Sequence, residues 1–129
     1  MAIQDLLKDK NELIDYNHLC KKHSWILEKN HCCVLSPDSD GLLCGLFMSM
    51  YRGWKIVGFY DGKVAIINKD YINNNPIFLD IEIFRKEIRS IGHHMLLLNK
   101  KHIPGEWTNF DNCIQPNNLR NYDGKKIIG

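Results

Sequence analysis

The distribution of apolar and polar residues over 31–51 predicts a strand, a loop and a helix, in that order. A short apolar run predicts a buried strand over 31–35. Apolar residues then recur at helical spacing over 42–51. The loop between them carries two carboxylates, Asp38 and Asp40. Because ligands bind beyond the carboxyl ends of the strands in open α/β sheets, this loop is the first candidate for a functional site.

The same patterns predict the remaining elements, with Asp61-Gly62 as a tight-turn signal between two strands. Strands are expected over 54–60, 63–67, 77–84 and 93–98, and the stretch 77–84 can also be a strand that runs into a helix. Helices are expected over 3–10, from residue 11 or 15 to 28, over 85–91 and as one turn over 119–122. The stretch from Asn99 onward otherwise reads as loop.

This order of elements favours an α/β fold of three layers, in which helices cover both faces of a mostly parallel sheet. The length of 129 residues suits a single domain with its own core. The last residues, 123–129, resemble the start of a further turn and strand. We therefore expect residues 1–129 to be one α/β domain, and to be a fragment or the N-terminal domain of a longer chain.

Composition narrows the picture only modestly. The chain is 44% hydrophobic and 25% charged with a formal net charge of +2, which is ordinary for a globular protein and demands no nucleic acid. No apolar run approaches the roughly 20 residues that cross a bilayer, and the charged N-terminus lacks the core of a signal peptide. We expect a cytoplasmic protein that binds no membrane.

The cysteines are also those expected of a cytoplasmic protein. Five cysteines is an odd number, and none form a C-x-x-C pair, so reduced and mostly buried thiols are expected. His18, Cys20 and His23 do not have the spacing of paired zinc ligands. Helical or core placement is the better interpretation of these three residues.

Three groups of side chains have the chemistry of a metal site. Asp38 and Asp40 lie two apart on the loop, and carboxylate oxygens are the ligands that Mg²⁺ and Mn²⁺ prefer. Asp80 interrupts an apolar run, where an unpaired carboxylate would cost a few kcal/mol. His93 and His94 follow Gly92, and imidazole is a good ligand and donor to phosphate.

Each of these residues also has a plainer, structural interpretation. An aspartate can be a helix N-cap, Asp80 can pair with a basic side chain, and a histidine can occupy a core position. Glu82 is a weaker candidate on the same face as Asp80.

These residues carry a family resemblance. Pro37-Asp38-Ser39-Asp40-Gly41 resembles the first motif of the DHH-type phosphoesterases, Asp80 resembles their second motif, and Gly92-His93-His94 resembles their Asp-His-His triplet. The resemblance covers about 31–98. It implies that Asp38, Asp40, Asp80 and His93 ligate Mn²⁺ or Mg²⁺ and that His94 contacts phosphate. It also implies hydrolysis of phosphodiester or phosphoanhydride bonds in nucleotides or single-stranded nucleic acid.

The chain departs from the family pattern at several positions. Gly92 stands where the triplet has aspartate, and Val34 and Ser36 occupy the positions where a histidine usually precedes the first motif. Asp111 and Asp123 are the candidates for a further, later aspartate. The substrate-binding domain of the family is not in this sequence, so a missing C-terminal domain or a protein partner is expected.

Two alternatives remain open at this point. The first is a non-enzymatic α/β domain that binds a nucleotide, nucleic acid or protein partner, which the departures from the family pattern favour. The second is a phosphatase of the haloacid-dehalogenase type, whose nucleophile motif resembles Asp38-Ser39-Asp40-Gly41. In that family the aspartate usually follows the strand directly, whereas Ser36-Pro37 intervenes here.

Overall fold

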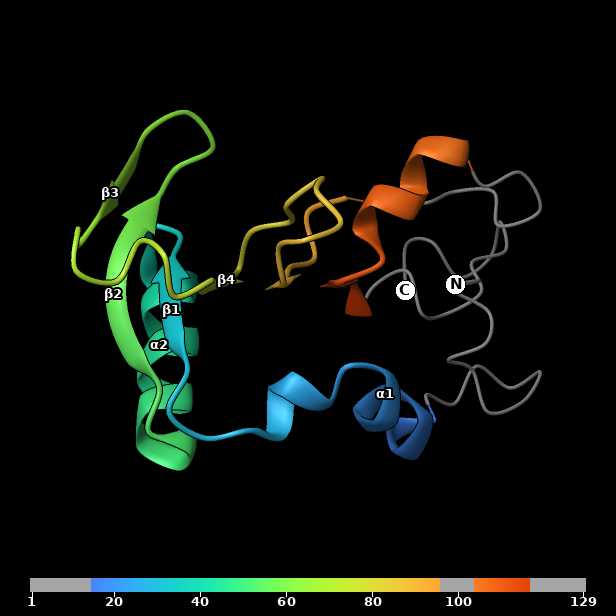
Figure 1. Ribbon diagram of the computed structural model, residues 1–129, viewed down its shortest axis with the longest axis horizontal. Helices are drawn as coiled ribbons and strands as arrows, with labels where there is room; N and C mark the ends of the chain where they lie inside the picture. Colours follow the sequence, from blue (N-terminus) through green and yellow to red (C-terminus); the bar gives the residue numbers. More distant parts are fainter. Residues whose placement is uncertain (1–14, 96–103, 117–129) are drawn as a thin grey trace.

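A six-stranded sheet forms the central layer of the computed structural model, which describes residues 15–95 and 104–116 (Figure 1). Across the sheet the strands run in the order β3-β2-β1-β4-β5-β6. The β2–β3 pair is antiparallel, and every other pair is parallel. The strands are β1 (Cys32–Leu35), β2 (Lys55–Tyr60), β3 (Ala65–Ile67), β4 (Ile77–Leu79), β5 (Ser90–Ile91) and β6 (Cys113–Ile114). The predicted mostly parallel α/β fold is confirmed.

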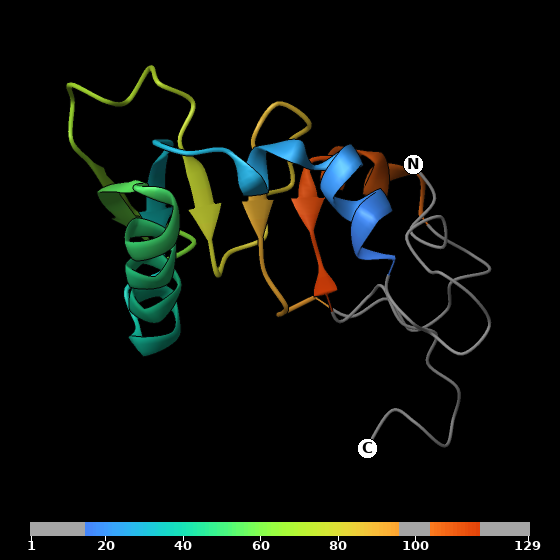
Figure 2. The ribbon, with the colours of Figure 1, turned by 90° about the horizontal axis from the view of Figure 1, so that it is seen from below.

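Helices lie on both faces of this sheet. The two α-helices and the first 3-10 helix lie on one face, and a second 3-10 helix lies on the opposite face (Figure 2). In chain order they are α1 (Tyr16–Lys22), η2 (Ser24–Leu27), α2 (Ser39–Arg52) and η3 (Gly105–Phe110). Asp15 caps α1 by accepting a hydrogen bond from the backbone N–H of His18, and Gly53 ends α2 in the left-handed conformation.

The core lies where α2 and η2 meet the sheet. Cys33, Val34 and Leu35 of β1 are all fully buried. A central strand that is covered on both faces needs such an uninterrupted apolar run, which is the pattern by which the sequence predicts it. Trp54 and Ile77 extend the core, and the indole N–H of Trp54 donates to the carbonyl of Glu28 at 2.7 Å.

The order in which strands are added to the sheet reverses at β1. After β1 the chain forms α2 and then adds β2 on one side of β1, and it later adds β4 on the other side. The loops after β1 and β4 therefore diverge above neighbouring strand ends, which is the crevice where open α/β sheets place their ligands. The fold thus puts Ser36–Asp38 and Asp80 next to each other.

Helix α2 packs on the sheet through its small residues. Gly41 and Gly45 are its buried positions, whereas Leu43, Phe47 and Met50 are 63%, 59% and 75% exposed. Many of the apolar residues whose spacing predicts the helix are therefore exposed and do not pack against the core. A groove of about 400 Å³ runs beside this helix, and Trp25 and Ile91 help to line it.

Several predicted elements differ from those observed. The expected helix ending at residue 28 is two pieces, because α1 stops at Lys22 and η2 follows. The strand predicted over 77–84 ends at Leu79, since Asp80 adopts a left-handed backbone with φ of 64°. The helix predicted over 85–91 is wrong: turns there lead into β5.

The second half of the chain holds the other differences. Residues 93–95 form no strand, so the prediction over 93–98 is wrong for that part. Residues expected as loop contain η3 and β6 instead. The predictions for 3–10, 96–98, 119–122 and 123–129, with Asp123 among them, lie outside the described residues.

The five cysteines are all free, as expected. Cys33 and Cys113 are buried, and burial raises the pKa of Cys33 to about 12 and that of Cys113 to about 11. The other three are half-buried, which corrects the expectation of mostly buried thiols. Within the described ranges, no helix has the length and apolar character needed to span a bilayer.

His23 gives the fold a predicted pH dependence. Its side chain is 1% exposed, neither ring nitrogen has a hydrogen-bond partner among the described residues, and burial lowers its pKa from 6.5 to about 4. The unfolded chain therefore binds this proton at higher pH than the folded chain does. Folding stability should fall by about 3 kcal/mol as pH drops from 7 through 4, and this contribution levels off below that.

Urea unfolding at several pH values measures this effect. His23→Phe should flatten the slope of unfolding free energy between pH 6.5 and 4, whereas His18→Gln, on the exposed side of α1, should leave the slope as in wild type. An unchanged slope in the His23 variant would show that other groups set the pH dependence.

Candidate metal centre at the strand ends

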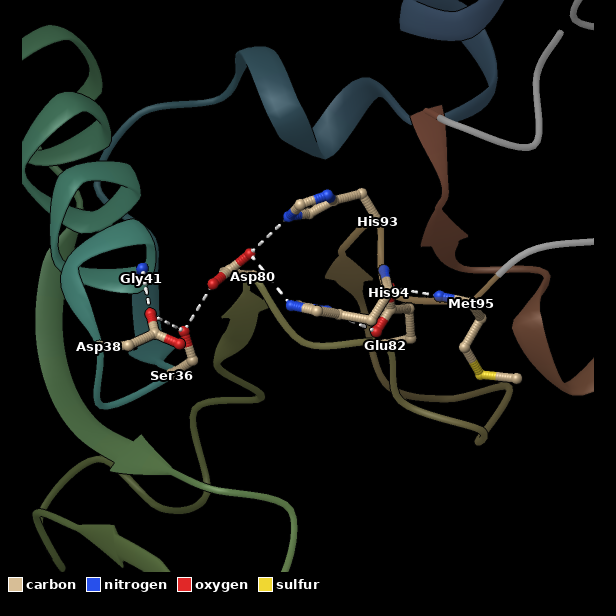
Figure 3. A network of polar contacts seen from close by, with 8 residues as sticks. All are labelled: Ser36, Asp38, Gly41, Asp80, Glu82, His93, His94 and Met95. Atoms are coloured by element: carbon tan, nitrogen blue, oxygen red, sulfur yellow. Dashed lines mark hydrogen bonds and ion pairs between the residues drawn. The ribbon is translucent and has the colours of Figure 1, made fainter. Parts of the chain in front are cut away.

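Asp80 is the central residue of the candidate site. It directly follows β4, and its side chain is 4% exposed. Its left-handed backbone is one that aspartate tolerates better than most residues. This turn ends the strand and directs the carboxylate sideways between two loops, so that each of its oxygens faces a different partner (Figure 3).

One oxygen of Asp80 is joined to the loop after β1. The Ser36 hydroxyl lies 2.8 Å from Asp80 Oδ2 and also 2.8 Å from Asp38 Oδ1. A hydroxyl carries one hydrogen, and an ionised carboxylate only accepts hydrogen bonds. Ser36 therefore donates to one carboxylate at a time, and Asp38 and Asp80 bring their oxygens together around it.

The other oxygen of Asp80 faces two histidines. Asp80 Oδ1 lies 3.4 Å from His93 Nε2 and 3.8 Å from His94 Nε2. The two rings lie 4.7 Å apart at their centroids, and both side chains are more than half exposed. Nitrogen and oxygen atoms of the three residues all lie within 4.8 Å of one another, as the ligands of one metal ion do.

The spacing of these atoms is informative. Both separations exceed the roughly 2.7–3.2 Å of an ordinary hydrogen bond. Two ligands bound at about 2.1 Å to the same ion are roughly 3.0–3.4 Å apart, depending on the coordination geometry. The Asp80–His93 distance thus fits a shared cation, and the Asp80–His94 distance needs a small adjustment.

Asp38 has a structural task beside this group. It is the N-cap of α2, and its Oδ1 accepts a 2.8 Å hydrogen bond from the backbone N–H of Gly41. The Gly41 N–H and the Ser36 hydroxyl lower the pKa of Asp38. Asp38 is therefore a fixed negative charge that the Ser36 hydroxyl connects to Asp80.

Asp40 is placed differently. It lies exposed in the first turn of α2, and among the described contacts none joins it to Asp80 or to either histidine. The motif resemblance implies that Asp38, Asp40, Asp80 and His93 ligate the metal and that His94 contacts phosphate. The structure groups Asp80, His93 and His94, with Asp38 connected through Ser36. Asp111, the other described candidate aspartate, follows η3 and is not in this group.

Glu82 and Ser36 are the residues whose importance the sequence understates. Glu82 accepts hydrogen bonds from His94 and lies in an alternate position to Asp80, which is the signal that made it a weak candidate. Ser36 stands in the place of an expected histidine and carries no motif of its own. Asp38, Asp80, Glu82, His94 and Tyr60 help to line a hollow of about 350 Å³, within the size range of small-ligand pockets.

Gly41 holds the loop after β1 against the first turn of α2, which generates a prediction. A Cβ on Gly41 would lie 2.2 Å from the Ser36 carbonyl oxygen. Gly41→Ala should therefore lower the free energy of unfolding by about 1–3 kcal/mol, as overpacking does. Gly105→Ala is the control, because a Cβ there meets no described atom within 4 Å. Urea unfolding compares the two variants, and equal stabilities would show that the loop yields without cost.

Comparison of the chain with models of protein families, with curated protein sequences and with solved structures found no match.

Proposed function

We propose that this chain is a divalent-metal-dependent phosphoesterase whose metal centre is formed by Asp80, His93 and His94. The observation that carries the proposal is the convergence of three ligand atoms within 4.8 Å of one another at the ends of two parallel strands. Because β4 borders the reversal of the sheet and β5 is its next neighbour, the centre lies beside the crevice where α/β folds bind their ligands. The hollow beside it has room for a phosphate group and part of its ester.

The donor set indicates which ion suits the centre. One carboxylate and two imidazoles fit Mn²⁺ or Zn²⁺ better than Mg²⁺, which prefers oxygen ligands in near-ideal octahedral geometry. Of the Mn²⁺ and Mg²⁺ that the motif resemblance implies, Mn²⁺ is therefore the ion we propose. Asp38 would add negative potential, and it would become a ligand if a second ion were bound between it and Asp80.

A divalent cation supplies Lewis-acid stabilisation of a phosphoryl group and favours attack by water. The residues of the chain would hold that group in place. His94 lines the hollow, so an ion that its Nε2 ligates would lie at the wall of the substrate space. Tyr60 lines the same hollow, and its ring offers a surface on which a base can stack. Nucleotides or single-stranded nucleic acid are the proposed substrates.

The geometry of Asp38 bears on the haloacid-dehalogenase alternative. That mechanism needs Asp38 to attack phosphorus, but its Oδ1 accepts hydrogen bonds from Gly41 and Ser36 and caps α2. A carboxylate oxygen held in this way is better suited to supporting a helix and a neighbouring charge. We therefore favour the metal-dependent reaction.

Asp80→Asn is the variant that tests this function. Asparagine tolerates the left-handed backbone and can still accept a hydrogen bond from Ser36, so the fold should persist. We expect wild type to cleave bis(p-nitrophenyl) phosphate with Mn²⁺ and the variant to lose at least about 100-fold of that rate, because several kcal/mol of stabilisation is removed. The rise in melting temperature on adding Mn²⁺ should disappear as well.

Asp70→Asn, in an exposed turn, is the matched control and should retain both activity and the thermal shift. Turnover that needs no metal, or turnover that survives in Asp80→Asn, would contradict the proposed centre. A wild-type protein with neither turnover nor a thermal shift would favour the non-enzymatic domain that binds a nucleotide, nucleic acid or protein partner.

A further inference from the structure

Glu82 engages His94 and its neighbour through three contacts. Its side chain is 6% exposed. One oxygen, Oε1, accepts from the backbone N–H of His94 and, at 3.3 Å, from the backbone N–H of Met95. The other oxygen, Oε2, lies 3.1 Å from His94 Nδ1 (Figure 3). Both the backbone and the ring of His94 are therefore bound to one buried carboxylate.

This arrangement determines which nitrogen of His94 faces the metal centre. An ionised carboxylate only accepts hydrogen bonds, so His94 Nδ1 must carry a hydrogen to bond with Glu82. In a neutral imidazole the lone pair then belongs to Nε2, the atom that lies 3.8 Å from Asp80 Oδ1. Metal-binding histidines commonly have such a carboxylate on the other ring nitrogen, which fixes the tautomer and orients the ring.

Gly92 is what makes room for Glu82. A Cβ on Gly92 would lie 2.7 Å from Glu82 Cδ and 2.8 Å from Oε1. The backbone there cannot easily move away, because the Gly92 N–H donates to the Ile114 carbonyl of β6 at 3.0 Å. Its φ is not positive, so glycine is needed here for space and not for an unusual backbone conformation.

We propose that Glu82 is a positioning residue that holds His94 with Nε2 directed at the metal centre, and that Gly92 is required because any side chain there would displace the Glu82 carboxylate. The consequence for metal binding rests on the proposed function above. The orientation of His94 does not, because it follows from the contacts with Glu82 alone.

Two measurements on matched variants test this proposal. Glu82→Gln replaces the carboxylate at nearly constant shape, and Gly92→Ala introduces the obstructing Cβ. Glu106→Gln and Gly105→Ala are the controls, since both residues are exposed on η3 and, in the part of the chain that the structure describes, a Cβ on Gly105 meets nothing within 4 Å. Circular dichroism verifies that each variant folds.

The first measurement is the ¹⁵N spectrum of the His94 ring in the metal-free protein at a pH where the ring is neutral. Wild type and both controls should show Nδ1 protonated and Nε2 unprotonated. Glu82→Gln and Gly92→Ala should show a mixture of the two tautomers. An unchanged spectrum in both variants would overturn the positioning role.

The second measurement is Mn²⁺ affinity by calorimetry. Glu82→Gln and Gly92→Ala should weaken binding by about 10–100-fold, as loss of the group behind a ligating histidine does, and the controls should bind as wild type. If wild type shows the tautomer but binds no Mn²⁺, the metal centre fails and the positioning role stands. If Mn²⁺ affinity is unchanged in a variant whose tautomer is mixed, Glu82 does not act on the metal and that part of the proposal is wrong.

A double variant separates crowding from simple misfolding. Glu82→Asp withdraws the carboxylate by one methylene, which leaves space for a Cβ on residue 92. Gly92→Ala should therefore lower the Mn²⁺ affinity, and the fraction of His94 that is protonated at Nδ1, by less in the Glu82→Asp background than in wild type. Additive effects in this cycle would show that the two residues do not act on each other.

Discussion

The hydrogen bond between Ser36 and Asp80 joins the two sides of the sheet reversal, and the candidate site depends on it. It connects the loop after β1 to the loop after β4, residues that are 44 positions apart in the chain. With Oδ2 of Asp80 held by Ser36, Oδ1 is left facing His93 and His94. The parallel pairing of β4 with β5 brings those histidines to the same edge. Sheet topology and one buried contact thus determine the group together.

Around this contact, each polar residue has a distinct position and task. Asp38 caps α2 and shares the Ser36 hydroxyl with Asp80, so hydrogen bonds link the first turn of the helix to the site. Glu82 lies on the far side and holds the ring of His94. Supporting carboxylates thus flank the proposed ligand group, an arrangement in which the surroundings fix the ligand atoms before an ion arrives.

The sequence predicts the parts of this structure that local signals determine. An apolar run predicts β1, and helical periodicity predicts α2. The Asp61-Gly62 pair predicts the turn between β2 and β3. Asp80 is visible because a carboxylate interrupts apolar residues, and His93-His94 because two imidazoles follow a glycine. The rule that parallel strands end at one edge of a sheet predicts that Asp38 and Asp80 lie near each other. It does not predict the place of the histidines, which the sequence puts at the start of a strand over 93–98 and which in fact follow β5.

The remaining features depend on contacts between distant residues. β5 and β6 are two residues each, and their pairing joins Ser90 to Cys113 across 23 positions, which no local pattern reveals. The task of Glu82 depends on how closely it approaches Gly92 in space. Asp40 has the right spacing for a ligand, but Asp38 takes the cap position, and the helix then carries Asp40 onto an exposed turn.

The left-handed backbone of Asp80 has a thermodynamic consequence. Most side chains avoid this conformation, and it persists where the surrounding structure holds it, here between β4 and the bridge that Ile81 forms with Ile91. The carboxylate is consequently immobilised when the protein folds. Whatever positive group it meets then encounters a preorganised partner, and little conformational entropy remains to be lost in the encounter.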